Sequence, residues 1–216
     1  MGKDFKLREA SDGNGGVYKA LKNSRMIDDM KQNNIKWVFI CGVDNIMANM
    51  IDLSFIGLTI DRNVQIASKS IAKSYPEEKV GVFCKRDGKP SIIEYIELSE
   101  EMIYSKNENG DLVYGDANIV SHLLSIEAIE KIAINDLDYH VAVKKNAYID
   151  ENLQEVIPEE PNSYKFEAFI FDGFKFLDDM AVYRVKREEE FAPIKNKDGT
   201  DSPDTAKQLY CAYWKK

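Results

Sequence analysis

The sequence predicts an α/β fold in which a mixed β-sheet is flanked by helices. Residues Ile35–Asn45 form an apolar, β-branched and aromatic run bounded by asparagines, which is typical of a strand buried on both faces of a parallel sheet. Residues Lys79–Leu98 predict two strands joined through Asp87 and Gly88, a pair favoured in tight hairpin turns. Segments with helical spacing of apolar residues alternate with these strands, as in α/β domains.

Two short helices are expected before the first strand. Ser24 can cap the start of the second helix, and Asn33 can end it. The apolar residues that indicate the two helices are Val17, Leu21, Ile27 and Met30.

Further strands and helices are expected after this region. Residues 64–72 partly alternate between polar and apolar types, which predicts an additional strand. Residues 117–125 predict another strand, and Ser125 can cap the helix expected over 126–133.

After residue 138, the chain is expected to form a hairpin outside the sheet and then to add a further strand to the sheet. A polar, proline-punctuated segment over about 139–165 predicts a hairpin excursion. A helix is expected over 167–180, a short strand over 181–185, and the start of a C-terminal helix over 201–216. The sequence contains no internal repeat or convincing interdomain linker, so residues 1–216 are predicted to form one domain.

Charge and cysteine content restrict the partners and the compartment. Asp and Glu outnumber Lys and Arg by 37 to 29, giving a net charge of −8 and no basic face for nucleic acid. The three cysteines (Cys41, Cys84 and Cys211) are far apart and lack C-x-x-C spacing, which argues against disulfides or zinc and favours a reducing cytoplasm. No apolar run approaches the roughly 18 residues of a membrane span, so no membrane partner is expected.

Asp44 follows directly on the strongest predicted strand. Ligands of open α/β sheets gather at the carboxyl ends of strands, where a carboxylate can hold Mg²⁺ against phosphates. Alternatively, Asp44 caps a helix over Asn45–Ile51. The residues alone leave both interpretations open.

The stretch DGNGG near the start of the chain also has two interpretations. Gly13, Gly15 and Gly16 permit positive φ and close approach of a ligand, while Asn14 offers a donor and an acceptor. An ordinary turn before a helix explains the same residues.

The aromatic residues and histidines have mainly structural interpretations. The two histidines, His122 and His140, lack Ser, Cys or acidic companions at metal or triad spacing and are interpreted as structural. Core packing is a simpler explanation than ligand stacking for five phenylalanines. These are Phe166, Phe169, Phe171, Phe174 and Phe176.

Seven motifs follow one another along almost the whole chain. They are DGNGGVYKAL, CGVDNIMANMIDLSFIGLTI, VGVFCKRDGKPSIIEYIELS, DANIVSHLLS, HVAVKK with YID, PEEPNSYKFEAFIFDGF and REEEFAPIKNKDGTDSPDTAK. In this order they resemble the uridylyltransferases of the UDP-sugar pyrophosphorylase family, and the nearest branch is the UDP-N-acetylglucosamine pyrophosphorylases. The resemblance runs from about Asp12 to about Lys207, and seven ordered motifs are more specific than any single one.

The resemblance implies a Rossmann-like, GT-A-like nucleotide-diphospho-sugar transferase fold and a Mg²⁺-dependent reaction. UTP and a sugar 1-phosphate would give pyrophosphate and a UDP-sugar, with UDP-N-acetylglucosamine as the first choice. The sugar phosphate oxygen would attack the α-phosphorus of UTP in line, without a covalent enzyme intermediate. UDP-glucose pyrophosphorylase activity is the alternative, because related enzymes take glucose or galactose 1-phosphate.

Motif matching also implies the residues of the site. Asp44 would hold the metal beside the phosphates, and Lys195 would reach the phosphates as a mobile positive charge. Glu94 would accept hydrogen bonds from sugar hydroxyls, and Gly81 would let the backbone approach the sugar. The other implied residues are Gly13 and Asn14, which would contact nucleotide and sugar, and Tyr95, Asn118, Phe169 and Phe171, which would line the sugar pocket.

The printed sequence departs from the family pattern in one respect. Family members begin the catalytic domain with a glycine-rich loop, L-x-G-G-x-G-T-R-L-G, that receives the triphosphate, and no such stretch occurs here. The chain is therefore expected to be a partial, N-terminally incomplete catalytic domain that is inactive without the missing N-terminal segment as its partner. The alternative is a non-catalytic UDP-sugar-binding protein that keeps the sugar pocket and lacks the triphosphate loop.

Overall fold

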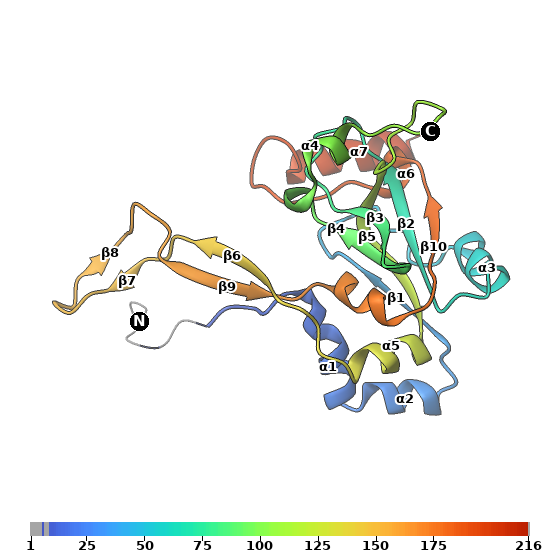
Figure 1. The fold of residues 1–216 in the computed structure, drawn as a ribbon, viewed down its shortest axis with the longest axis horizontal. Coiled ribbons are helices and arrows are strands. Elements are labelled where there is room, and N and C mark those ends of the chain that lie inside the picture. Colours follow the sequence, from blue (N-terminus) through green and yellow to red (C-terminus); the bar gives the residue numbers. More distant parts are fainter. Residues whose placement is uncertain (1–5, 7–8, 216) are drawn as a thin grey trace.

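A six-stranded mixed sheet forms the centre of the fold (Figure 1). The computed structural model describes residue 6 and residues 9–215, so residues 1–5, 7–8 and 216 of the predicted domain lie outside the described residues. The strands follow the order β10-β2-β5-β3-β4, and β1 pairs with β5 beside this path. The six strands are β1 (Trp37–Cys41), β2 (Ile66–Ala72), β3 (Val82–Arg86), β4 (Lys89–Ile93), β5 (Asp116–Ser125) and β10 (Ala181–Arg184).

The first strand differs from the sequence-based expectation. Strand β1 pairs antiparallel with β5 along its whole length, and its residues are only half-buried. The prediction of a strand in Ile35–Asn45 is confirmed, but its parallel pairing and full burial are wrong. Val38 packs against the core on one side of the sheet and Phe39 against that on the other. Both faces therefore require apolar residues even though the strand is not enclosed between two neighbours.

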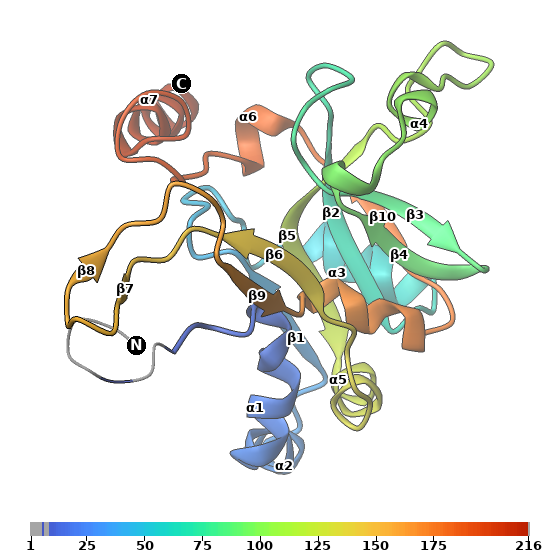
Figure 2. The ribbon, with the colours of Figure 1, turned by 60° about the vertical axis from the view of Figure 1, so that its left-hand side comes forward.

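Helices cover both faces of the sheet. Helices α1, α2 and α5 lie side by side against one face and share a core with η3 (Figure 2). Helix α3 covers the other face through Phe55, which clusters with Ala67 and Leu123. Within the described residues, no helix combines the length and the apolarity that crossing a bilayer requires. The helical elements are η1 (Asn14–Gly16), α1 (Val17–Asn23), α2 (Met26–Gln32), α3 (Leu53–Asp61), η2 (Tyr95–Glu97), α4 (Glu100–Tyr104), α5 (Ile126–Ala133), η3 (Ile170–Phe176), α6 (Arg187–Glu190) and α7 (Pro203–Trp214).

Several local signals in the sequence produce the predicted structures. Asp87 and Gly88 have φ values of 53° and 76° and connect β3 to β4 as a tight hairpin. The Ser125 hydroxyl accepts a hydrogen bond from the Ala128 N–H at 3.1 Å and caps α5. The strand expected within 64–72 is observed as β2, which is almost wholly buried.

The connection between α1 and α2 shows a different cap from the one predicted. Arg25, with φ of 60°, precedes α2 and makes no side-chain cap. Ser24 instead ends α1, and its hydroxyl donates to the Leu21 carbonyl at 3.3 Å. The left-handed turn at Arg25 displaces Ser24 from the start of α2. Asn33 ends α2 as expected.

Two segments predicted as helices are not α-helices. Asn45 forms an isolated bridge, and residues 46–51 form a turn, a bend and irregular backbone. The next helix, α3, begins only after Asp52, whose carboxylate accepts two backbone N–H groups. Within 167–180, only the 3₁₀ helix η3 forms. A Cβ at Gly173 would lie 2.5 Å from Ile132 Cγ2, so η3 packs closely on α5. Tertiary packing therefore overrides the helical spacing of the phenylalanines.

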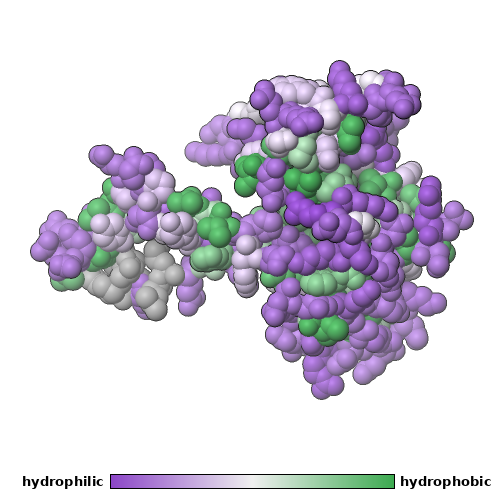
Figure 3. All heavy atoms as spheres, in the orientation of Figure 1, coloured by the Kyte–Doolittle hydropathy of each residue, from purple (hydrophilic) through white to green (hydrophobic). Residues whose placement is uncertain are grey.

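The excursion expected over about 139–165 is a long hairpin that projects from the body (Figure 1). Val141 lies opposite Phe166 and Val143 opposite Tyr164, and all four side chains are exposed. Apolar groups are accordingly visible on the projecting part in Figure 3. The strands of the excursion are β6 (His140–Lys144), β7 (Tyr148–Ile149), β8 (Glu155–Val156) and β9 (Ser163–Glu167).

Candidate functional site

The glycine-rich stretch packs directly against the segment that carries the phenylalanines. Gly13 has φ of 94°, and a Cβ there would lie 2.2 Å from the Ala168 carbonyl oxygen, so a larger residue does not fit. The Asn14 Oδ1 accepts a hydrogen bond from the Ile170 N–H at 2.9 Å, and the Gly15 N–H donates to Ala168 at 2.9 Å. The turn interpretation is therefore correct for the backbone, while the Asn14 side chain fixes the start of η3.

Two phenylalanines form a stacked pair at the start of η3. The rings of Phe169 and Phe171 are 5.1 Å apart and inclined by 21°. Phe171 is buried in the main core, whereas Phe169 is half-buried. Core packing thus explains Phe171, and Phe169 presents part of its ring outside the core.

A histidine and an aspartate clamp this aromatic pair to the base of the hairpin. His140 Nε2 lies 2.9 Å from Asp172 Oδ1, and Asp172 Oδ2 accepts a hydrogen bond from the Phe169 N–H at 2.6 Å. The imidazole of His140 also lies 5.0 Å from the Phe169 ring. The acidic partner of His140 lies 32 residues away, outside any metal or triad spacing in the sequence, and folding brings the two together.

Strand β4 ends at a second group of predicted residues. A Cβ on the buried Gly81 would lie 3.0 Å from Glu94 Oε1, so the absence of a side chain leaves room for the carboxylate. The Gly81 carbonyl accepts a hydrogen bond from the Asn118 N–H at 2.8 Å. The Asn118 Oδ1 in turn accepts the Val120 N–H at 2.9 Å. Gly81, Glu94 and Asn118 are therefore neighbours across β3, β4 and β5.

The Glu94 carboxyl lies in an environment that disfavours its charge. Burial raises the pKa of Glu94 above its usual range, and the nearby negative charge of Glu97 raises it further. Electrostatic interactions with His140 and Lys195 act on the pKa of Glu94 in the opposite direction. A partly desolvated carboxyl of this kind is typical of ligand sites.

A hollow lies beside Phe171 of the aromatic pair. It has a volume of about 370 Å³, and its lining includes Glu97, His140, Phe171 and Asp172. Tyr95, by contrast, is 40% exposed on η2 and has no hydrogen-bond partner among the described residues. The structure brings the other residues of this region together, and Tyr95 stays at their margin.

Asp44 and Lys195 lie on two segments that pair like strands. The Ile194 N–H donates to the Asp44 carbonyl at 2.8 Å, and Asn45 forms an antiparallel bridge with Pro193. The buried Asn45 side chain donates to the Glu190 carbonyl at 2.8 Å. Its Oδ1 accepts the Ala192 N–H at 2.9 Å, across 147 residues of sequence. We call this pairing of residues 44–47 with 190–194 the Asn45 zipper.

Asp44 is free to bind a ligand. No helix starts behind it, so the helix-cap interpretation is wrong, and its carboxylate has no hydrogen bond or ion pair among the described residues. A Cβ at Gly42 would lie 2.6 Å from Asp44 Oδ1, so the carboxylate folds back over Gly42. Lys195 is exposed, and its ammonium likewise has no partner among the described residues.

Asp44 offers one unpaired carboxylate as a candidate ligand for a magnesium ion. Within the described residues, no three His, Cys, Asp or Glu side chains form a metal-binding group. Mg²⁺ in phosphate-binding sites is commonly held by one or two carboxylates together with substrate oxygens and water. The single unpaired carboxylate of Asp44 meets that requirement.

Comparison with known proteins establishes the family. The family model described as UTP–glucose-1-phosphate uridylyltransferase matches residues 4–200. The chain belongs to this family. The resemblance inferred from the seven motifs is thereby confirmed, and the mixed sheet flanked by helices is the uridylyltransferase fold.

Individual relatives belong to the UDP-N-acetylhexosamine branch. The chain is 39% identical over 208 residues to UDP-N-acetylhexosamine pyrophosphorylase-like protein 1 of Xenopus tropicalis, covering 94% of this chain and 41% of the relative. It is 40% identical to UDP-N-acetylglucosamine diphosphorylase 2 of Arabidopsis thaliana, covering 95% and 41%. A crystal structure of the Trypanosoma brucei UDP-N-acetylglucosamine pyrophosphorylase with an inhibitor superposes with a TM-score of 0.81 at 30% identity, covering 94% and 42%. The chain thus spans less than half the length of these relatives.

Proposed function

We propose that this chain carries the sugar-binding and part of the phosphate-binding site of a UTP:sugar-1-phosphate uridylyltransferase that forms UDP-N-acetylglucosamine. The observation that supports this most strongly is the Asn45 zipper, which sets Asp44 beside the segment of Lys195. Asp44 and Lys195 carry opposite charges without protein partners among the described residues, in a chain of the uridylyltransferase family. We call Asp44 and Lys195 the phosphate side, and Glu94, Phe169 and Phe171 the sugar side.

The chemistry assigns a role to each side. An oxygen of the sugar phosphate attacks the α-phosphorus of UTP, and the bond from that phosphorus to the bridging oxygen breaks to release pyrophosphate. Lys195 holds the phosphates as a positive point charge, and Asp44 would hold Mg²⁺, which supplies further charge neutralisation when bound. Protein groups thus position the reactants and offset charge, without forming a covalent intermediate.

The sugar side orients the second substrate. The Glu94 carboxylate accepts hydrogen bonds from sugar hydroxyls, and these bonds compensate for its desolvation. The exposed part of the Phe169 ring offers an apolar wall for an N-acetyl methyl group. Gly13, Asn14, Gly81, Asn118 and Tyr95 complete the proposed contacts.

A cytoplasmic location is part of the proposal. Cys41, Cys84 and Cys211 are all free in the structure. Unpaired cysteines are typical of a reducing compartment.

A calorimetric titration tests the proposal. The purified chain is titrated in Mg²⁺ with UDP-N-acetylglucosamine, UDP-glucose and UTP, alongside Glu94→Gln and Lys195→Ala. We expect UDP-N-acetylglucosamine to bind best, with a loss of about 10-fold or more for each variant. Lys197→Ala is the matched control, because Lys197 is also exposed and lies two residues beyond Lys195.

Other outcomes would contradict specific parts of the proposal. Stronger binding of UDP-glucose than of UDP-N-acetylglucosamine would show that the sugar of the substrate is glucose. Binding of UDP-sugars without UTP turnover, even when the N-terminal part of a relative is supplied, would favour a non-catalytic binding protein. Failure of the folded chain to bind any UDP-sugar would refute the assigned residues.

A further inference from the structure

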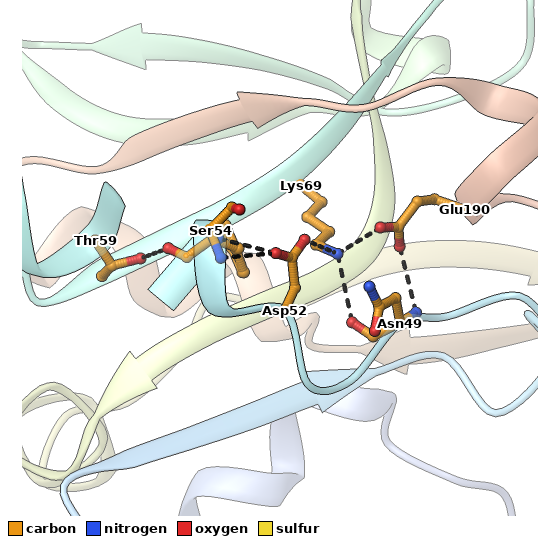
Figure 4. A network of polar contacts seen from close by, with 7 residues as sticks. Asn49, Asp52, Ser54, Thr59, Lys69 and Glu190 are labelled. Carbon is orange, nitrogen blue, oxygen red and sulfur yellow. Dashed lines mark hydrogen bonds and ion pairs between the residues drawn. The ribbon is translucent and has the colours of Figure 1, made fainter. Parts of the chain in front are cut away.

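Lys69 of β2 is fully buried, and its side chain points toward Asn49, Asp52 and Glu190 (Figure 4). The Lys69 ammonium lies 2.8 Å from Asp52 Oδ2 and 2.6 Å from Glu190 Oε1, and it donates to the Asn49 carbonyl at 3.4 Å. The side chain of Lys69 is 0% exposed, and those of Asp52 and Glu190 are 15% and 8% exposed. Lysine is almost never fully buried unless it is paired.

Every charged group of this network is satisfied within the protein. Asp52 Oδ1 accepts the N–H groups that begin α3, at 3.0 and 3.1 Å. Glu190 Oε2 accepts the Asn49 N–H at 3.3 Å. Burial alone would raise the pKa of Asp52, but hydrogen bonds from Lys69 and the α3 backbone hold that pKa below its usual range. The network therefore stays charged and joins β2, the loop before α3 and α6.

The two segments joined by Lys69 are the ones that carry the phosphate side. Asn49 lies five residues after Asp44, and Glu190 lies five residues before Lys195. Between them is the Asn45 zipper, whose hydrogen bonds also end on Glu190 through its carbonyl. Lys69 thus joins the two segments at one end of the Asn45 zipper, and Asp44 and Lys195 lie at the other end.

Stability alone does not account for such a network. Removing charges from water costs free energy that ion pairing regains only in part, and apolar replacements of buried ion pairs are often neutral or stabilising. Charged hydrogen bonds, however, impose directions and distances that apolar contacts do not. A site that neutralises phosphates needs its charges fixed at a defined separation.

We propose that Lys69, with Asp52 and Glu190, is a positioning residue that sets the separation between Asp44 and Lys195. This inference rests on the proposed function for its consequence in catalysis. The structural part of the inference is that Lys69 fixes how residues 44–47 align with residues 190–194. This part depends only on the distances between Lys69 and its partners. Lys69 touches neither substrate nor metal and acts through the two segments that it joins.

A neutral replacement of the whole network tests the inference. The variant Lys69→Met with Asp52→Asn and Glu190→Gln keeps the approximate shapes and leaves no buried charge unpaired. We expect its free energy of unfolding to stay close to that of the unchanged chain, while the Ile194 N–H, bonded to Asp44, exchanges with deuterium at least 10-fold faster. In the active form of the enzyme, kcat should fall about 100-fold with little change in the KM of the sugar 1-phosphate, as expected for misplaced groups.

Two further variants keep the test decisive. Glu190→Gln alone removes one charge and should show a smaller acceleration of exchange in the same direction, which remains measurable if the triple variant folds poorly. Ser68→Ala is the matched control on the opposite face of β2, where the hydroxyl contacts His122 at 2.7 Å. It should change unfolding without changing exchange at Ile194.

The outcomes separate this inference from the proposed function. Unchanged exchange and unchanged kcat in the folded triple variant would overturn the positioning role. Faster exchange in a chain whose unchanged form neither binds UDP-sugars nor supports turnover would keep the structural role of Lys69 and refute the proposed function. A parallel fall of stability and activity in Ser68→Ala would identify both effects as general destabilisation, which also counts against positioning.

Discussion

The phosphate side and the sugar side of the proposed site are held in place by different kinds of contact. In the network that supports the phosphate side, the side chains of Lys69, Glu190 and Asp52 are 0%, 8% and 15% exposed. The sugar side depends on His140 and Asp172, whose side chains are 32% and 11% exposed, at the base of a projecting hairpin. The difference agrees with the proposed function, in which the phosphates are common to all substrates and the sugar differs among them.

The largest expected effect lies on the phosphate side. Lys69→Ala would leave Asp52 and Glu190 buried and facing each other, so we expect a loss of about 3–5 kcal/mol in the free energy of unfolding. Urea denaturation measures this loss. Lys31→Ala removes an exposed ion pair with Glu130 and should have little effect. Equal losses in the two variants would show that burial does not make the Lys69 network more important for stability than an exposed ion pair.

The second effect concerns the turn that anchors the sugar side. Gly13→Ala would place a Cβ 2.2 Å from the Ala168 carbonyl at a φ of 94°. Strain and overpacking together should cost about 2–4 kcal/mol, measured by thermal or urea unfolding. Gly88→Ala is the control, because Gly88 also has positive φ but has open space around it, so only about 1 kcal/mol is expected. A cost at Gly13 no larger than that at Gly88 would show that the contact with η3 is easily relieved.

A third experiment tests the clamp between the hairpin and η3. His140→Ala removes the partner of Asp172, and the start of η3 should become less well ordered. We expect UDP-N-acetylglucosamine to bind about 10-fold more weakly, the equivalent of one hydrogen bond to a charged group. UTP binding should be nearly unchanged. His140→Gln keeps a donor and should recover part of the affinity in calorimetry, whereas equal weakening of both ligands would contradict the division into two sides.

The smallest effect is a stabilisation. The pKa of Glu94 is raised in the fold by burial and by Glu97, so its ionised form opposes folding once the pH rises above that pKa. Glu94→Gln should therefore raise the free energy of unfolding at pH 7, while weakening sugar binding. The gain should disappear as the pH falls and Glu94 takes up a proton. A gain that persists at pH 4 would point to packing instead of charge.

Sequence reasoning identified the elements that carry their own local signals. The hairpin turn at Asp87 and Gly88 and the cap at Ser125 each depend on a few adjacent residues, and both are confirmed. The antiparallel pairing of β1 and the 3₁₀ form of η3 depend on distant partners. For η3, close packing of Gly173 on Ile132 decides the outcome. The spacing of apolar residues along the sequence contains no information about such distant partners.

The candidate site shows the same difference between residues that a local motif reveals and residues that depend on distant partners. Motif resemblance supplied Asp44, Glu94 and Lys195, which remain predictions until ligands are measured. The groups that hold them were not found, because no local pattern relates Lys69 to Glu190, 121 residues away. A lysine in an otherwise buried strand was the available signal, since it implies a carboxylate partner. Sequence alone could have raised the question of that partner but could not have identified it.

The tip of the projecting hairpin has a consequence for how this protein can change in evolution. Asp150 satisfies the backbone of the tip locally by accepting the N–H groups of Asn152 and Gln154 at 2.9 and 2.8 Å. Insertions and deletions between β7 and β8 should therefore be tolerated, as at other exposed loop tips. A single residue inserted between Glu167 and Phe169 would instead displace the segment after β9 from its contacts with Gly13 and Asn14 and turn the aromatic pair away from its neighbours. Length variation should accordingly accumulate at the far end of the hairpin and be excluded from its base.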